Sequence, residues 1–185
     1  YPDNTYTKLD YYDGSGKTIM VNEDGTTKSS YTDLIGRTVK IETINNSQLV
    51  SVFYEYDKAG NNTKVTDPEG NVTTNTYDAK SRLTKTSNTV DNAAVETVYA
   101  YDAFSNLVKV TDPMGNDTQS VYDELGRVIQ NTDSLGKTEK TKYDAMGNPV
   151  QTVARSGIVT TYEYNPRGWL AKSTTGSIVT EMAYD

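Results

Sequence analysis

The sequence predicts an all-β protein made of consecutive antiparallel β-hairpins, and three observations support this fold class. A tyrosine recurs about every 21 residues along the 185-residue chain, and the motif Asp-x-x-Gly recurs along with it. The segments between these motifs are rich in Val, Thr and Tyr, which favour strands over helices. Turn signals arrive about every 10 residues, so we expect about two strands of five to six residues per repeat and roughly 16 to 18 strands in total.

The tyrosine period extends over the whole chain. The recurring residues are Tyr12, Tyr31, Tyr56, Tyr77, Tyr101, Tyr122, Tyr143, Tyr164 and Tyr184, with spacings of 19, 25, 21, 24, 21, 21, 21 and 20. The two longest repeats contain polar or small insertions at residues 45–48 and 90–93, where a turn would otherwise stand. Such self-similarity is typical of repeat proteins, in which one hairpin cannot bury its apolar face alone and neighbours must stack. We therefore expect a single array over residues 1–185, without a separate second domain.

The shorter motif has a backbone explanation. Asp-x-x-Gly begins at Asp13, Asp33, Asp57, Asp67, Asp112, Asp123, Asp133 and Asp144, with Asn in first place at Asn22 and Asn165 and Ser in last place after Asp78 and Asp102. A type I turn favours Asp or Asn at its first position, Pro at its second and Gly at its fourth. "DPEG" (67–70) and "DPMG" (112–115) satisfy all three preferences. With Gly in the left-handed region, such a turn forms the bulged loop of a β-hairpin.

The expected strands lie between these turns. "NTKVT" (62–66), "NLVKVT" (106–111) and "TQSVY" (118–122) are rich in β-branched residues and partly alternate between apolar and polar. The best helical candidate is "DNAAVETVYAY" (91–101), but its Val-Tyr ending favours a strand.

Composition excludes several classes of function. The net charge of −7 and the scattered basic residues argue against nucleic acid as a partner, which needs clustered Lys and Arg. The chain has no His and no Cys, so Ser-His and Cys-His triads, disulfides and His-based metal sites are absent. No apolar run approaches the roughly 20 residues that a membrane-spanning helix needs. "DGSG" (13–16) lacks the lysine of a phosphate-binding loop.

Three candidate sites have simpler structural interpretations. The regular aspartates resemble a calcium array, but each turn supplies about one carboxylate, and its role in starting the turn already explains it. The tyrosines are suited to stacking on sugars, but one tyrosine per repeat also forms a ladder that holds adjacent hairpins together. Trp169, the lone Trp, follows "PRG" and is a weak ligand-binding candidate or a local packing variant. We expect no catalytic residue, no cofactor and no bound metal, and therefore no enzyme.

The motifs "YDAMGN", "YDELGR", "YEYNPRGWL", "VTDPEGNVT" and "VTDPMGND" resemble the tyrosine-aspartate (YD) repeats of Rhs proteins. The same repeats occur in bacterial wall-associated proteins, in the B and C subunits of insecticidal toxin complexes and in teneurins. The resemblance covers essentially the full chain and implies one long antiparallel sheet that spirals into a hollow shell, an Rhs-type β-shell. Asp is replaced at Thr32 and Asn165, and Gly at Ser81 and Ser105, which leaves the turn geometry there open.

The resemblance also implies a function. Such shells enclose a C-terminal polypeptide, often a toxin, and members with that role carry a self-cleavage segment after the repeats. No "DPxGL"-type segment ends this chain, so no catalytic residue is transferred to it. We expect a structural repeat segment of a large secreted or cell-wall-associated bacterial protein, with the C-terminal effector domain of the parent chain as its partner. The alternative is a carbohydrate- or receptor-binding module in cell-surface adhesion.

The ends of the sequence lead to a further expectation. The chain starts at Tyr1 and stops at Asp185, inside the motif, so we expect it to be a piece of a longer protein. Cutting a sheet leaves two terminal strands with unpaired N–H and C=O groups. We therefore expect self-association through these open edges, end to end or through the concave face.

Overall fold

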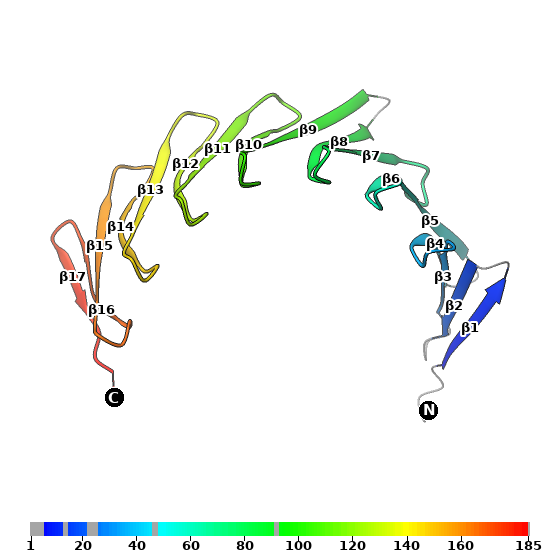
Figure 1. Ribbon diagram of the computed structural model, residues 1–185, viewed down its shortest axis with the longest axis horizontal. Helices are drawn as coiled ribbons and strands as arrows, with labels where there is room; N and C mark the ends of the chain where they lie inside the picture. Colours follow the sequence, from blue (N-terminus) through cyan, green and yellow to red (C-terminus); the bar gives the residue numbers. More distant parts are fainter. Residues whose placement is uncertain (1–5, 13–14, 22–25, 46–47, 91–92, 185) are drawn as a thin grey trace. The chain divides into compact units, whose positions relative to one another are not determined.

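The computed structural model describes residues 6–12, 15–21, 26–45, 48–90 and 93–184. Within these ranges the chain forms strands and turns, and no helix occurs (Figure 1). Contacts divide the chain into two compact units, Tyr1–Thr97 and Val98–Asp185, and strand β9 (Ala93–Tyr101) passes from the first unit into the second. The predicted all-β fold class is confirmed, and the expected strand at the end of residues 91–101 is β9. The single array over residues 1–185 stays a prediction.

The first unit is an antiparallel meander in which each strand from β1 to β7 pairs with the next one along the chain. Its strands are β1 (Tyr6–Tyr12), β2 (Ser15–Val21), β3 (Thr27–Thr32), β4 (Thr38–Asn45), β5 (Gln48–Tyr56), β6 (Asn62–Thr66), β7 (Val72–Tyr77) and β8 (Leu83–Val90). The predicted strand "NTKVT" coincides with β6.

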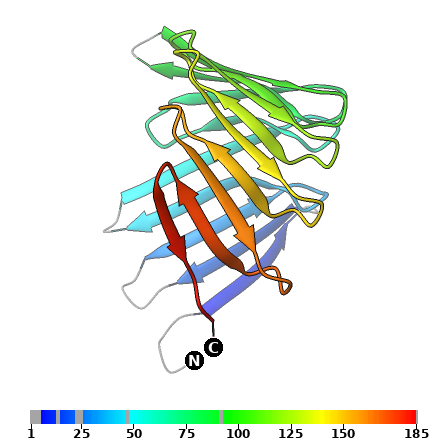
Figure 2. The same cartoon turned by 90° about the vertical axis from the view of Figure 1, so that its left-hand side faces the viewer.

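The second unit continues the same pattern from the end of β9, and each strand again pairs antiparallel with the next. Its strands are β10 (Leu107–Thr111), β11 (Asp117–Tyr122), β12 (Val128–Thr132), β13 (Thr138–Tyr143), β14 (Pro149–Val153), β15 (Val159–Tyr164), β16 (Leu170–Thr175) and β17 (Ile178–Glu181). Figure 2 shows its strands from yellow to red following one another in chain order, with hairpin turns at both ends of the strands. The described residues thus contain 17 strands, within the predicted range.

The two insertions lengthen strands. Strands β4 and β5 have 8 and 9 residues, and β8 and β9 have the same lengths, whereas most other strands have five or six. Asn45 pairs with Gln48, so the extra residues extend the first of these hairpins beyond its neighbours. Residues 46–47 and 91–92 lie outside the described residues.

The sheet has almost no buried interior. Among the described residues no hydrophobic side chain is buried, and Ser29 is the one buried polar residue, at 7% exposure. Hydrophobic burial therefore contributes less to stability than in a packed domain, and contacts between neighbouring hairpins contribute correspondingly more. The described part of the chain also contains no helix suited to crossing a membrane.

Candidate functional site at the tyrosine edge

Two kinds of turn alternate along each unit. We call the turns that follow a Tyr-Asp pair, or its variants, the tyrosine edge: residues 33–37, 57–61, 78–82, 102–106, 123–127, 144–148 and 165–169. We call the turns at the other end of the strands the opposite edge: residues 67–71, 112–116, 133–137 and 154–158.

The two edges differ in register. At the tyrosine edge Val121 pairs with Gln130 but Tyr122 pairs with Val128, so Ile129 is an extra residue, and the same shift recurs in every described hairpin of this edge. The opposite edge closes without a shift. A β-bulge bends its strand and increases the local twist. Each repeat therefore carries a bend at one end only.

The aspartate of each turn organises the turn backbone. The N–H of Asp144 donates to the carbonyl of Asn148 (2.9 Å), and the N–H of Gly147 donates to the carbonyl of Asp144 (3.2 Å). Oδ1 of Asp144 accepts the N–H groups of Met146 (2.9 Å) and Asn148 (2.8 Å), while Gly147 has a φ of 92°. This is the predicted type I turn with a glycine bulge. The predicted turns at Asp13 and Asn22 lie outside the described residues.

The residue after the glycine completes the turn, and sequence reasoning assigned it no role. Nδ2 of Asn148 donates to Oδ2 of Asp144 (3.0 Å), and Nε of Arg127 donates to Oδ2 of Asp123 (2.7 Å). The same contact is made by Arg37, Asn61, Asn71, Arg82, Asn106 and Asn116. The signal was visible in the sequence, since Asn or Arg follows the glycine in "YDAMGN" and "YDELGR".

These hydrogen bonds hold the turn carboxylates in the charged form. The side-chain amide of Asn148, followed by its backbone N–H, lowers the pKa of Asp144. A side-chain amide and a backbone N–H of the Asn after the glycine or serine also lower the pKa of Asp57, Asp67, Asp102 and Asp112. At Asp33, Asp78 and Asp123 the backbone N–H of the following Arg, and then its guanidinium, lower the pKa. Both oxygens of such a carboxylate already accept donors of the same turn, which favours turn chemistry over calcium binding. Within the described residues no group of three or more potential metal ligands comes together.

A hydroxyl latch connects consecutive repeats at this edge. In six pairs, the hydroxyl of a recurring tyrosine donates to the backbone carbonyl of the residue that begins the strand after the preceding tyrosine-edge turn. The pairs are Tyr56–Thr38 (2.8 Å), Tyr77–Asn62 (2.9 Å), Tyr122–Leu107 (2.9 Å), Tyr143–Val128 (3.2 Å), Tyr164–Pro149 (2.9 Å) and Tyr184–Leu170 (2.8 Å). We call this contact the tyrosine latch. The predicted ladder therefore works through the hydroxyls and the backbone.

Tyr164 shows the electrostatic setting of a latch. Its pKa is raised by burial first and then by electrostatic interactions with Tyr162 and with the Asp144 carboxylate. The phenol accordingly keeps its proton at neutral pH and remains a hydrogen-bond donor.

Arginine reinforces the latches of Tyr143 and Tyr56. The Arg127 guanidinium lies over the ring of Tyr143, 4.6 Å from its centroid, and Nη1 donates to the carbonyl of Asp144 (3.2 Å). Arg37 does the same with Tyr56 (4.8 Å) and the carbonyl of Asp57 (3.1 Å). One side chain thus links the carboxylate of its own turn to the tyrosine and the turn of the next repeat.

Trp169 occupies the same turn position as these arginines. Its ring lies 5.1 Å from that of Tyr184, tilted by 58°, and the Arg167 guanidinium lies 5.3 Å from its centroid. Trp169 remains 42% exposed. It therefore packs between neighbours as an inter-repeat contact, and its role in ligand binding stays a prediction.

The departures from the motif keep the turn geometry. Ser81 (φ 61°) and Ser105 (φ 75°) take the left-handed conformation of the missing glycines, and Ser81 N–H donates to the carbonyl of Asp78 (3.0 Å). At Asn165, Oδ1 accepts the N–H groups of Arg167 and Trp169, both at 3.0 Å. The substitutions are therefore accommodated without a change of fold.

One member of the predicted tyrosine series, Tyr31, does not occupy the latch position. The register shift and the pairing of Thr32 with Thr38 place Thr32, which precedes Asp33, at the latch position. The Thr32 hydroxyl donates to the carbonyl of Gly16 (3.3 Å). Tyr31 is one residue out of step, and its hydroxyl donates to the Glu42 carboxylate instead. It belongs to the sequence period but is not a latch.

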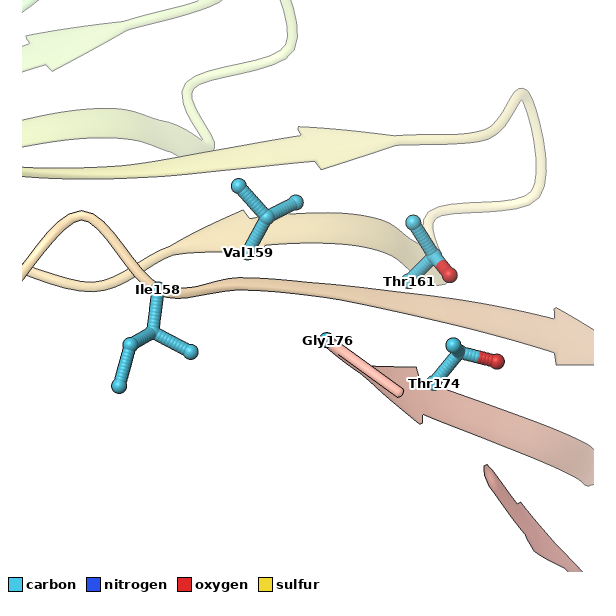
Figure 3. A pocket seen from close by; sticks show the side chains of 5 residues that line it. All are labelled: Ile158, Val159, Thr161, Thr174 and Gly176. Carbon is cyan, nitrogen blue, oxygen red and sulfur yellow. The ribbon is translucent and has the colours of Figure 1, made fainter. Parts of the chain in front are cut away.

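Two shallow hollows lie on the second unit. The one in Figure 3, of about 380 Å³, is lined by Ile158, Val159, Thr161, Thr174 and Gly176, none of which is ionisable. The other, of about 470 Å³, lies over β12 and β13, and its lining includes Arg127, Lys140 and Tyr143. The first hollow offers no acid–base group for catalysis, and the second includes residues of a latch.

The comparisons with known proteins agree with this geometry. Residues 73–185 match the family model described as the teneurin YD-shell. No curated protein sequence matches. The fold is similar to the crystal structures of TcdB2-TccC3-TEV (TM-score 0.68, 16% identity), of TcdB2-TccC3 without hypervariable C-terminal region (0.71, 16%) and of TcdB2-TccC3 (0.69, 17%). Each match covers 85% of this chain and 9%, 9% and 10% of the other chain, respectively, so this chain spans about a tenth of those chains.

Proposed function

Since the chain belongs to the teneurin YD-shell family, we propose that it forms part of the wall of a β-shell that encloses the C-terminal effector region of a larger parent protein. The chain is a segment of a YD-type β-shell with the fold seen in TcdB2-TccC3. One of those proteins has a hypervariable C-terminal region, as the structure that lacks it is described. The enclosing role is the part that we propose for this chain.

The main observation behind the proposal is that the sheet has no hydrophobic core among its described residues. No described hydrophobic side chain is buried, so the sheet presents side chains on both of its faces. A wall needs this property, because one face meets the exterior and the other meets the enclosed polypeptide.

The asymmetric bulges favour a wall that curves. Every described tyrosine-edge hairpin carries one extra residue, whereas the opposite edge closes in regular register. Because a bulge bends its strand and increases twist, a bend repeated once per hairpin accumulates in one sense. The tyrosine latches and arginine contacts fix the spacing between successive bends.

The role is accordingly structural and not catalytic. The aspartates, which are the most regular ionisable groups, are engaged in turns, and the tyrosine hydroxyls are engaged in latches. Secretion or attachment to the bacterial cell wall, as the Rhs resemblance implies, belongs to the same proposal.

Limited proteolysis of the full-length parent protein tests this function. We expect the C-terminal region to resist a protease in the intact protein. Combining Tyr122→Phe, Tyr143→Phe and Tyr164→Phe weakens three successive latches and should accelerate its cleavage, whereas Tyr54→Phe, which removes a hydroxyl outside the latches, should not. If the C-terminal region of the intact protein is digested as fast as the isolated region, the chain does not enclose it.

A further inference from the structure

Five consecutive turns of the second unit present large apolar side chains to solvent. They stand at the third turn position, directly before the glycine or serine in the left-handed conformation. Their exposed fractions are 89% for Phe104, 87% for Met114, 72% for Leu125, 80% for Leu135 and 80% for Met146. We take this regular series of exposed apolar side chains as a candidate interaction surface.

The turn itself does not require apolar residues there. The same position holds Ala59, Glu69, Lys80, Ser156 and Arg167 in five other described turns with the same backbone hydrogen bonds, and Ile35, which is 74% exposed, in one turn of the first unit. Polar side chains therefore fit the turn equally well, and the turn backbone gives no reason for five apolar residues in succession.

The turns hold these residues in fixed positions. The backbone N–H groups of Phe104, Met114, Leu125, Leu135 and Met146 each donate to Oδ1 of the aspartate that begins the turn, at 2.8–3.0 Å. A preorganised contact residue loses less conformational freedom on binding than one on a flexible loop.

The five residues form two rows with the same spacing. Phe104, Leu125 and Met146 lie at the tyrosine edge, while Met114 and Leu135 lie at the opposite edge. Successive residues of a row are two strands apart, about 10 Å at the usual strand spacing, and the rows are offset by one strand, about 5 Å. The row of two therefore matches the two gaps in the row of three.

We propose that the opposite-edge row of one copy of this chain packs between the tyrosine-edge residues of a second copy. The matching spacing favours this occupant, because another array of the same hairpins presents apolar residues at the same interval. The net charge of −7 disfavours an anionic membrane as the occupant. The contact is head-to-tail, since each copy uses one row and leaves the other free. With few residues on each side, we expect weak association.

Sedimentation velocity of the chain over a range from about 10 µM to about 1 mM tests the proposal. We expect the average mass of the wild-type chain to rise with concentration. The triple variant Phe104→Ser, Leu125→Ser, Met146→Ser and the double variant Met114→Ser, Leu135→Ser should each raise the dissociation constant at least about tenfold. Mixing the two variants should restore a 1:1 complex, because each retains the row that the other lacks.

Matched variants separate this contact from other kinds of association. Ala59→Ser and Glu69→Ser alter the same turn position in the first unit and should leave the association unchanged. Val179→Pro blocks pairing at the β17 edge, so it removes the edge association expected from the sequence but should leave the association that the serine variants weaken. The proposal is overturned if Val179→Pro abolishes association while the serine variants do not, or if the wild type stays monomeric throughout. It is equally overturned if the monomer binds anionic phosphatidylglycerol vesicles through these residues.

Discussion

At the residue scale, the recurring contact of this structure is the tyrosine latch. The hydroxyl of a tyrosine in one repeat donates a hydrogen bond to a backbone carbonyl at the start of a strand in the preceding repeat. With no buried hydrophobic residue among the described ones, such half-buried hydrogen bonds take on part of the role of a core.

Tyr56→Phe removes one latch hydroxyl and keeps the ring below Arg37. The hydroxyl donates to the Thr38 carbonyl at 2.8 Å, and a hydrogen bond of this kind contributes about 1 kcal/mol to stability. We expect the free energy of unfolding of the first unit to fall by that amount in urea titrations. Tyr54→Phe, two residues earlier on β5, is the matched control and should change it much less. Equal effects of the two substitutions would show that the latch contributes nothing specific.

Ser81→Gly should stabilise the first unit. Ser81 has a φ of 61°, and a residue with a Cβ loses about 1–2 kcal/mol in the left-handed region, part of which the greater backbone entropy of unfolded Gly offsets. We expect a net gain of about 0.5–1 kcal/mol by thermal or urea unfolding. The converse change, Gly60→Ser, should destabilise the first unit, because Gly60 has a φ of 91°. Since a Cβ at this position would meet no atom within 4 Å, the loss would come from backbone strain and not from a steric clash. If the two changes act in the same direction, backbone strain is not the cause.

At the element scale, the turns couple stability to pH. A carboxyl whose pKa is lower in the folded than in the unfolded chain contributes stability above the unfolded pKa, about 3.9 for Asp. This contribution is lost as the pH falls through the lower folded pKa values. Because the pKa is lowered at eight turn aspartates, we expect the urea midpoint to be constant above about pH 5 and to fall below about pH 4. A midpoint that rises on acidification would contradict this account.

Asn148→Ala tests one turn alone. The Asn148 amide is the main cause of the lowered pKa of Asp144, so we expect that pKa to rise toward its ordinary value. Carboxyl titration by NMR measures this shift, with Asp112, whose own partner is Asn116, as the internal control. An unchanged pKa of Asp144 would show that the backbone N–H groups alone hold the carboxylate.

The sequence predicts the strands and turns, which depend on residues close together in the chain, but it does not predict the contacts between repeats. The strand at residues 62–66 and the turns that begin at Asp67 and Asp112 follow from β propensity and turn preferences, which act within a few residues. The latch acceptors could not be predicted, because a backbone carbonyl has no side-chain signature. Tyr31 was aligned by residue type, but the register of Thr32 and Asp33 decides which residue becomes the latch.

At the scale of the whole molecule, each unit is a row of similar hairpins, and we propose that such rows continue into the wall of the parent protein. The family assignment and the turn geometry agree that the repeat is a building element, and the bulge at one edge gives that element a direction of bending. Trp169 and the apolar turn residues are the places where the second unit departs from the plain repeat, and they are therefore where additional contacts are expected.

Cryo-electron microscopy of the parent protein with its C-terminal region is the most direct test of the central claim. We predict that residues 73–185 form consecutive strands of a closed wall, with their latches intact and with density for the C-terminal region inside it. A C-terminal region located outside the wall, or a sheet that remains open to solvent on both faces, would contradict the claim.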